Sequence, residues 1–105
     1  MSKVKTRFFW MIQNELDKAE EKHPKFFDRL TGARQENMDA YEHRIKMVNK
    51  KGPFYAEFIL DEEKVEELNA YLKGDKEHCL QELAQCGAVI LRMMQFVYDE
   101  MEAGK

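Results

Sequence analysis

The sequence predicts an all-α protein built from four helices. Its composition is rich in Glu, Lys, Leu and Met, which favour helices over strands. Apolar residues recur at spacings of three and four, with no alternating pattern typical of strands. The 5 glycines and 2 prolines are few, and several of them punctuate the helical patterns. A chain of 105 residues has room for one core, so residues 1–105 are predicted to form a single domain.

The first helix is expected over residues 3–22. Pro24 ends it, because the residue before a proline is disfavoured in helical geometry. Residues 23–33 then form a connection whose aromatic side chains, Phe26 and Phe27, are expected to pack against the bundle. The apolar face of this helix carries Phe8, Ile12, Leu16 and Ala19, broadened by Phe9 and Trp10.

A second helix is expected over residues 34–50 and a third over residues 53–73. Gly52 suits the end of the second helix, and Pro53 suits the first position of the third. The predicted core positions of the second helix are Met38, Tyr41, Ile45 and Val48, and those of the third are Phe54, Phe58, Val65, Leu68 and Leu72.

The fourth helix is expected over residues 76–102, after a turn at Gly74-Asp75 in which Asp75 is the N-cap. Because this turn is short, the third and fourth helices should lie antiparallel in a four-helix bundle. The predicted core stripe of the fourth helix is Leu80, Leu83, Gly87, Ile90, Met94, Val97 and Met101.

Charge and hydropathy narrow the class of partner. The net charge is −3, and the basic residues stand among acids without forming a stripe, which argues against nucleic-acid binding. No segment approaches the ~20 apolar residues that span a bilayer, and the run at residues 8–12 is too short for a signal peptide. Cys79 and Cys86 lie two helical turns, ~10 Å, apart, too far for a disulfide. Reduced thiols indicate a cytoplasmic protein.

Acidic residues in the third and fourth helices form the clearest candidate site. Glu62, Glu63 and Glu66 lie within about one turn of the third helix, at the border of its apolar stripe. Glu82 and Gln85 border the stripe of the fourth helix in the same way. If the two helices pair through the intervening turn, the two patches can face each other. Inward-facing carboxylates on facing helices are how bundles bind hard divalent cations.

The alternative is that these acids form a solvated helix face. Two unpaired carboxylates ~6 Å apart repel by ~3 kcal/mol at an effective dielectric constant near 20. Converging acids therefore need a cation or basic neighbours unless they stand in open water. Lys64 and Lys73 are candidates for such neighbours, so repulsion alone leaves both interpretations open.

The spacing of these residues resembles that of a known family. Glu-Glu-Lys-Val-Glu (62–66), the helix breaker Gly74-Asp75 and Glu-Leu-Ala-Gln-Cys-Gly-Ala-Val (82–89) are similar to MazG-type nucleotide pyrophosphohydrolases. That all-α family has an ExxE followed by an ExxD. Here Glu63 and Glu66 fit the first half, and Glu82 begins the second after 15 residues. The similarity covers about residues 58–92, and residues 15–24 resemble the leader of small phage-type members.

The resemblance implies an activity and a set of ligands. Glu63, Glu66 and Glu82 would bind Mg²⁺, or Mn²⁺ in its place. Glu62 would be a further ligand, or the group that orients and deprotonates the attacking water. The reaction would be hydrolysis of a nucleoside triphosphate to a monophosphate and pyrophosphate. Family members of this size build their site from paired subunits, so a homo-oligomer, a dimer or tetramer, is expected.

The sequence departs from the family pattern at Gln85, where the last acid of ExxD is expected. An amide oxygen can bind a hard cation but brings no charge, so metal binding should be weaker. Two other functions therefore remain open. One is a catalytically weak or inactive relative that binds a nucleotide or metal, and the other is a structural helical interaction protein whose acids are a solvated face.

Residues that would contact the nucleotide are less clearly marked. Arg92 lies seven residues beyond Gln85 on the same side of the helix and is the candidate phosphate contact, with a surface ion pair as its alternative. Trp10, or Phe9 beside it, is the candidate for stacking on the base, with core packing as the alternative for either residue. His78, in the first turn of the fourth helix, is expected to be exposed to solvent.

Overall fold

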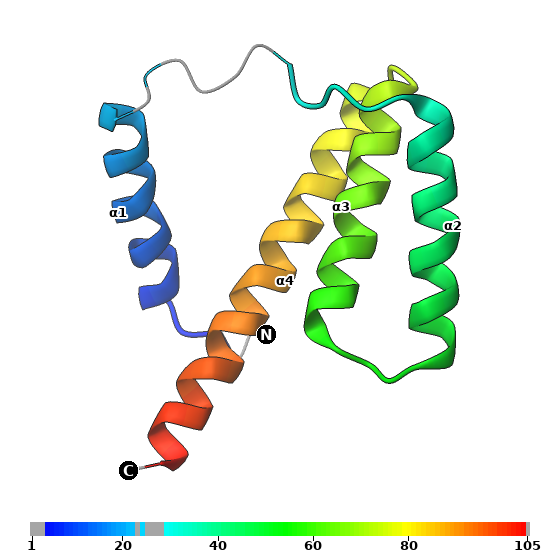
Figure 1. Ribbon diagram of the computed structural model, residues 1–105. Helices are drawn as coiled ribbons and strands as arrows, with labels where there is room; N and C mark the ends of the chain where they lie inside the picture. Colours follow the sequence, from blue (N-terminus) through cyan, green and yellow to red (C-terminus); the bar gives the residue numbers. More distant parts are fainter. Residues whose placement is uncertain (1–3, 23, 25–28, 105) are drawn as a thin grey trace. The chain divides into compact units, whose positions relative to one another are not determined.

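The computed structural model describes residues 4–22, 24 and 29–104, and this part of the chain forms four α-helices and no strand (Figure 1). The helices are α1 (Arg7–Lys22), α2 (Gln35–Lys51), α3 (Ala56–Leu72) and α4 (Lys76–Ala103). The all-α prediction and the number of helices are therefore confirmed. The predicted packing of Phe26 and Phe27 lies outside the described residues. Over the described ranges, no helix is long and apolar enough to cross a bilayer.

The chain divides into two compact units, to each of which α4 contributes. The terminal unit comprises Met1–Asp28 and Leu91–Lys105, and the central unit comprises Arg29–Ile90. The assignment of the whole chain to one domain stays a prediction.

In the central unit, α2 and α3 lie side by side (Figure 1). Ile45 of α2 is buried, and Val65 of α3 is fully buried with 0% exposure. Burial of such aliphatic side chains contributes about 1.5–3 kcal/mol each. Gly52 ends α2 as predicted, with φ 81° and its N–H donated to the Val48 carbonyl at 3.0 Å.

The predicted start of α3 at Pro53 is wrong. The helix begins at Ala56, and Tyr55 before it has extended backbone (φ −108°, ψ 140°). Pro53 therefore lies in the connection between α2 and α3, where its peptide bond to Gly52 is cis. Phe54, predicted as a core residue, is likewise in the connection and exposed.

The turn between α3 and α4 forms as predicted. Gly74 has φ 82°, a conformation that favours glycine, and donates its N–H to the Tyr71 carbonyl at 3.0 Å. Asp75 donates its N–H to the Ala70 carbonyl at 3.0 Å, which completes a Schellman motif. The Asp75 side chain then accepts the N–H of His78 at 3.0 Å and so caps α4. Antiparallel packing along the full helices stays a prediction.

The buried face of α4 differs from the predicted stripe. Leu80 is 69% exposed, and Leu83, Ile90, Val97 and Met101 are exposed as well. Cys79 and Glu82 are buried instead, one position before Leu80 and Leu83. One residue is a rotation of about 100° on a helix, so the inward face is the neighbouring, more polar one. The apolar pattern missed this face because the side chains that meet α3 include a carboxylate.

The terminal unit has a small apolar contact between α1 and the end of α4. Phe8 is buried and meets the Tyr98 ring edge-on at 6.0 Å, while the Arg7 guanidinium lies 4.3 Å from that ring's centroid. The Lys5 N–H is donated to the Gln95 side chain at 3.0 Å. The other predicted core residues of α1, Ile12, Leu16 and Ala19, are exposed.

Candidate metal centre

Three carboxylates from α3 and α4 converge in the central unit. Glu63 and Glu66 project from successive turns of α3, and Glu82 projects from α4. One oxygen of each lies within 4.8 Å of the others. Glu82 is only 5% exposed, and the two α3 carboxylates are half-buried, so the acids do not form the solvated face of the alternative interpretation. We refer to Glu63, Glu66 and Glu82 as the acidic triad.

Gln85 lies against the same triad. With its amide nitrogen turned toward the acids, it donates to Glu63 Oε2 at 2.7 Å and to Glu82 Oε2 at 3.2 Å. In this orientation Gln85 bridges two carboxylates of the triad. To act as a metal ligand, this amide would have to present its oxygen instead.

The triad carries unfavourable negative charge. Burial, and then repulsion from Glu63 and Glu82, raise the pKa of Glu66 to about 7. Burial also raises the pKa of Glu63, helped by a hydrogen bond with Glu82 and by repulsion from Glu82 and Glu62. Lys46 opposes both shifts without cancelling them. A divalent cation would relieve this repulsion.

The basic neighbours of the triad are not those that the sequence suggested. Lys46 of α2 approaches Glu66 Oε1 at 3.8 Å, while Lys64 and Lys73 are exposed. Nothing in the spacing of α2 marked Lys46, because its position depends on how α2 packs on α3. His78 is exposed as predicted, yet its Nε2 lies 3.0 Å from Glu82 Oε1. The i, i+4 spacing of that pair could have revealed it.

Glu62, the predicted general base, lies on the α2 side of α3. Its Oε1 accepts a hydrogen bond from Asn49 Nδ2 at 3.2 Å, and the same amide donates to the Phe58 carbonyl at 3.0 Å. The Asn49 Oδ1 atom is buried and has no hydrogen-bond partner among the residues that the structure describes. Glu62 is thus held in a defined orientation by a residue that sequence reasoning did not identify.

The two predicted nucleotide contacts belong to the other unit. Trp10 is 66% exposed on α1, so the alternative that it packs in the core of the chain is wrong. Arg92 is exposed on α4, at the start of the α4 segment in the terminal unit. Their roles toward a nucleotide stay predictions.

The comparisons with known proteins identify no relative. No protein-family model matches the chain, and neither the curated proteins nor the solved structures contain a significant match.

The donor set suits a hard divalent cation. All three triad ligands are carboxylates, and no sulfur or imidazole ligand is needed to complete the group. Mg²⁺ and Mn²⁺ prefer such oxygen ligands, and Mg²⁺ usually keeps several waters when few carboxylates bind it. The raised pKa of Glu66 is consistent with a group that gains most from a bound cation.

Proposed function

We propose that this protein is a MazG-like nucleotide pyrophosphohydrolase that uses Mg²⁺ to hydrolyse a nucleoside triphosphate to a monophosphate and pyrophosphate. The observation that carries the proposal is the convergence of the acidic triad from two helices, with Gln85 beside it. These are the residues whose spacing resembles the family signature. The convergence of Glu63, Glu66 and Glu82 from two helices supports this proposal, because a shared metal site requires it.

Each acid has a role in this proposal. Glu63, Glu66 and Glu82 hold the cation, and Gln85 adds a neutral oxygen at most. A bound Mg²⁺ would neutralise charge on the substrate phosphates and lower the pKa of a bound water. Glu62 orients and deprotonates the attacking water, and its hydrogen bond from Asn49 favours this role because it fixes the carboxylate in one orientation.

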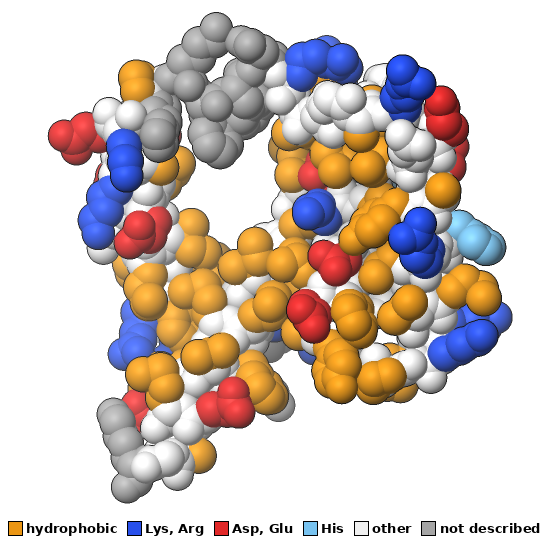
Figure 2. Space-filling view, in the orientation of Figure 1, with side chains coloured by type: hydrophobic (Ala, Val, Ile, Leu, Met, Phe, Trp, Pro, Cys, Tyr) orange, Lys and Arg blue, Asp and Glu red, His pale blue; other side chains and the backbone are white. Residues whose placement is uncertain are grey.

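The proposed function also includes self-association of the chain. Large apolar side chains are exposed on α1 and on the C-terminal half of α4, and Figure 2 shows hydrophobic side chains gathered on the visible faces of both segments. A second copy of the chain would bury this surface, so we propose a homodimer or tetramer. Within each chain we propose that α3 and α4 pack antiparallel, because the turn between them is short. We also propose a cytoplasmic location. The free cysteines Cys79 and Cys86 support it, because thiols stay reduced in that compartment.

Gln85 favours a second candidate function. Its amide bridges Glu63 and Glu82 by donating to both, which partly satisfies the acids without a metal. A chain with one carboxylate fewer could bind a nucleotide or metal without turning it over. This candidate predicts binding of Mg²⁺ and a nucleoside triphosphate with no product formed.

The test is a panel of ribo- and deoxyribonucleoside triphosphates with Mg²⁺ or Mn²⁺ and a pyrophosphate readout. We expect release that depends on the metal and disappears in Glu63→Gln. The matched control is Glu57→Gln, the same change at an exposed position in the first turn of α3. No release above Glu63→Gln with any substrate would overturn the enzyme, and binding without release would favour the second candidate.

A further inference from the structure

We propose that Lys46 of α2 is a substrate-contacting residue of this site, whose ammonium group binds phosphate oxygens of the nucleotide. The proposal rests on the proposed function, because it assumes a cation in the acidic triad. It adds a residue that lies outside the segment resembling the family, and it places the phosphates on the α2 side of the triad.

The first observation is the position of the Lys46 ammonium group. Its Nζ lies 3.8 Å from Glu66 Oε1 and 3.5 Å from Glu42 Oε2, and the side chain is 50% exposed. At 3.8 Å the contact with Glu66 is an ion pair without a short hydrogen bond. An ammonium group has three N–H donors, so Lys46 retains donors for a ligand.

The second observation is that a partly buried network orients Glu42, which contacts Lys46. The Asn69 side chain is 3% exposed, and its Nδ2 donates to Glu42 Oε1 at 3.0 Å. Asn69 Oδ1 in turn accepts from Gln35 Nε2 at 2.6 Å. Glu42 therefore has one oxygen fixed by a buried amide while the other contacts Lys46. Because Glu42 is oriented in this way, it offers Lys46 a contact at a fixed place beside the triad.

The third observation concerns the charge of the site. The triad has three carboxylates, and one divalent cation neutralises two of their charges, which leaves the loaded site negative. A polyphosphate approaching it would be repelled unless another cation lay alongside. Lys46 is the lysine that contacts the triad among the ion pairs of the described chain.

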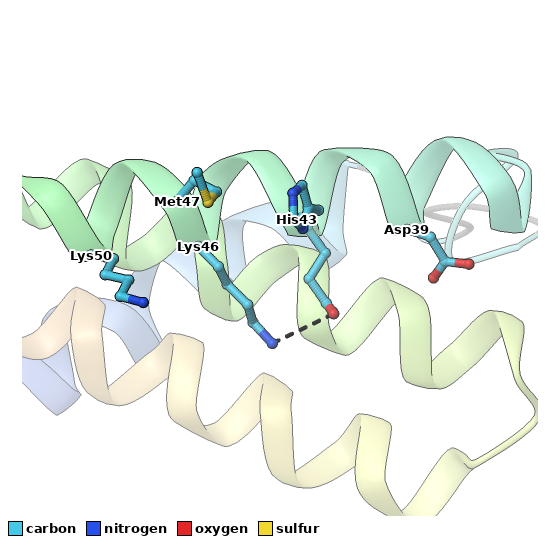
Figure 3. Close-up of a pocket in the computed structure, with 6 residues that line it drawn as sticks. Asp39, His43, Lys46, Met47 and Lys50 are labelled. Atoms are coloured by element: carbon cyan, nitrogen blue, oxygen red, sulfur yellow. Dashed lines mark hydrogen bonds and ion pairs between the residues drawn. The ribbon is translucent and has the colours of Figure 1, made fainter.

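A second lysine lies on α2 near Lys46. Lys50 lies one turn beyond Lys46, and Figure 3 shows both side chains extending from the same side of α2. They line an open groove of about 310 Å³ together with Asp39, Glu42, His43 and Met47. A polyphosphate held at Lys46 has space to continue toward Lys50, so Lys50 should contribute a smaller share of the binding.

The competing interpretation is that Lys46 only neutralises Glu66. The substitution Lys46→Met removes the charge and keeps a side chain of similar length. The two roles predict different effects of this substitution on substrate binding. Without Lys46 the triad is more negative, so Mn²⁺ alone should bind more tightly under either role. A phosphate contact also predicts weaker substrate binding, whereas a neutralising role predicts substrate binding that is unchanged or tighter.

The experiment measures Mn²⁺ binding alone, inorganic pyrophosphate binding in the presence of Mn²⁺, and kinetics on the best substrate of the panel. For Lys46→Met we expect KM and the pyrophosphate Kd to rise about 10-fold, the size of one charge-assisted hydrogen bond, with kcat nearly unchanged. Lys46→Arg should restore part of the loss. The matched control is Lys64→Met, which removes an exposed lysine next to Glu63 and should leave KM unchanged.

The outcomes separate this proposal from the proposed function. Pyrophosphate binding that is unchanged in Lys46→Met, or absent in the unaltered protein, would overturn the phosphate contact. Loss of pyrophosphate binding in Lys46→Met, in a protein that hydrolyses no nucleotide, would support the contact and refute the enzyme. Thermal unfolding of each variant checks that the helices remain intact.

Discussion

At the residue scale, the position of Gln85 bears on how strongly the proposed site would bind a cation. Its amide contacts Glu63 and Glu82 together, so it occupies the place where a further ligand would stand. As a donor it stabilises the metal-free carboxylates, and it adds no charge for a metal. Both effects weaken metal binding relative to a site with a carboxylate at this position.

Replacing Gln85 by aspartate should reverse both effects. We expect Gln85→Asp to bind Mn²⁺ about 10-fold more tightly, because it adds a charged oxygen ligand. The metal-free variant should also be less stable at pH 8, because like charges then crowd the site. Calorimetric titration with Mn²⁺ and urea unfolding measure the two effects. An unchanged Mn²⁺ affinity would mean that residue 85 does not reach the ion.

The Glu66 carboxyl should make stability depend on pH. Its pKa is about 7 in the folded protein and near 4.5 ordinarily, so the folded state holds a proton that the unfolded state releases. The stability this contributes is full below about pH 4.5, falls as pH rises toward 7 and is lost above that. Urea unfolding between pH 4.5 and 8, with a chelator present, should follow this course.

Two variants isolate the contribution of Glu66 to that profile. Glu66→Gln should flatten the decline, so that the variant gains stability relative to the unaltered protein as pH rises. Glu57→Gln, at an exposed position on the same helix, should follow the unaltered protein. Saturating Mg²⁺ at pH 8 should stabilise the unaltered protein and have little effect on Glu66→Gln. Parallel profiles for all three proteins would contradict this assignment.

At the element scale, the turn between α3 and α4 sets which residues of the two helices meet. Gly74 closes α3 and Asp75 opens α4 with no residue between them. Because so short a connection leaves α4 little freedom, the face bearing Cys79 and Glu82 is directed toward α3. Cys79 Sγ lies 3.7 Å from Glu67 Oε2, next to the turn. The site therefore depends on a local motif outside it.

Loss of the α4 cap should weaken this arrangement. Asp75→Ala removes the acceptor of the His78 N–H and should lower the free energy of unfolding by about 1 kcal/mol. Asp75→Asn retains an acceptor oxygen and should cost much less. Urea unfolding at one pH measures both variants. Equal losses in the two would indicate that the charge of Asp75, and not its cap, stabilises the helix.

At the scale of the whole molecule, the proposed self-association rests on exposed apolar side chains of the terminal unit. Phe96 and Met101 on α4 are exposed, as are Phe9 and Trp10 on α1. A groove of about 380 Å³ lined largely by Met and aromatic side chains lies in the same unit. An apolar surface of this kind is costly to leave in water, which is why we expect an oligomer.

Light scattering tests the oligomer directly. We expect a mass of two or four chains for the unaltered protein, and a shift toward the monomer for Phe96→Asp, which places a charge in the apolar surface. Phe54→Asp, at an exposed phenylalanine of the α2–α3 connection, is the matched control and should keep the larger mass. A monomer at all concentrations would contradict self-association.

Helix positions were predictable where local chemistry sets them. Pro24 and Gly52 end helices, and Asp75 caps one, because backbone geometry and capping act within a few residues. The triad was also predictable, since its spacing resembles a family signature. The inward face of α4 was not predictable, because it directs polar side chains toward α3. The apolar stripe around Leu80 predicted the neighbouring face of the helix instead.

The sequence by itself determined the helical class and the C-terminal ends of α1, α2 and α3, because these depend on interactions along one helix or one turn. It also marked the residues of the acidic triad through their spacing. The tertiary structure alone decided that Gln85 bridges two acids and that Lys46 and Asn49 approach the site from α2. Those contacts join residues from different helices. Their positions depend on how α2, α3 and α4 pack in the central unit, and spacing along the chain carries no information about that.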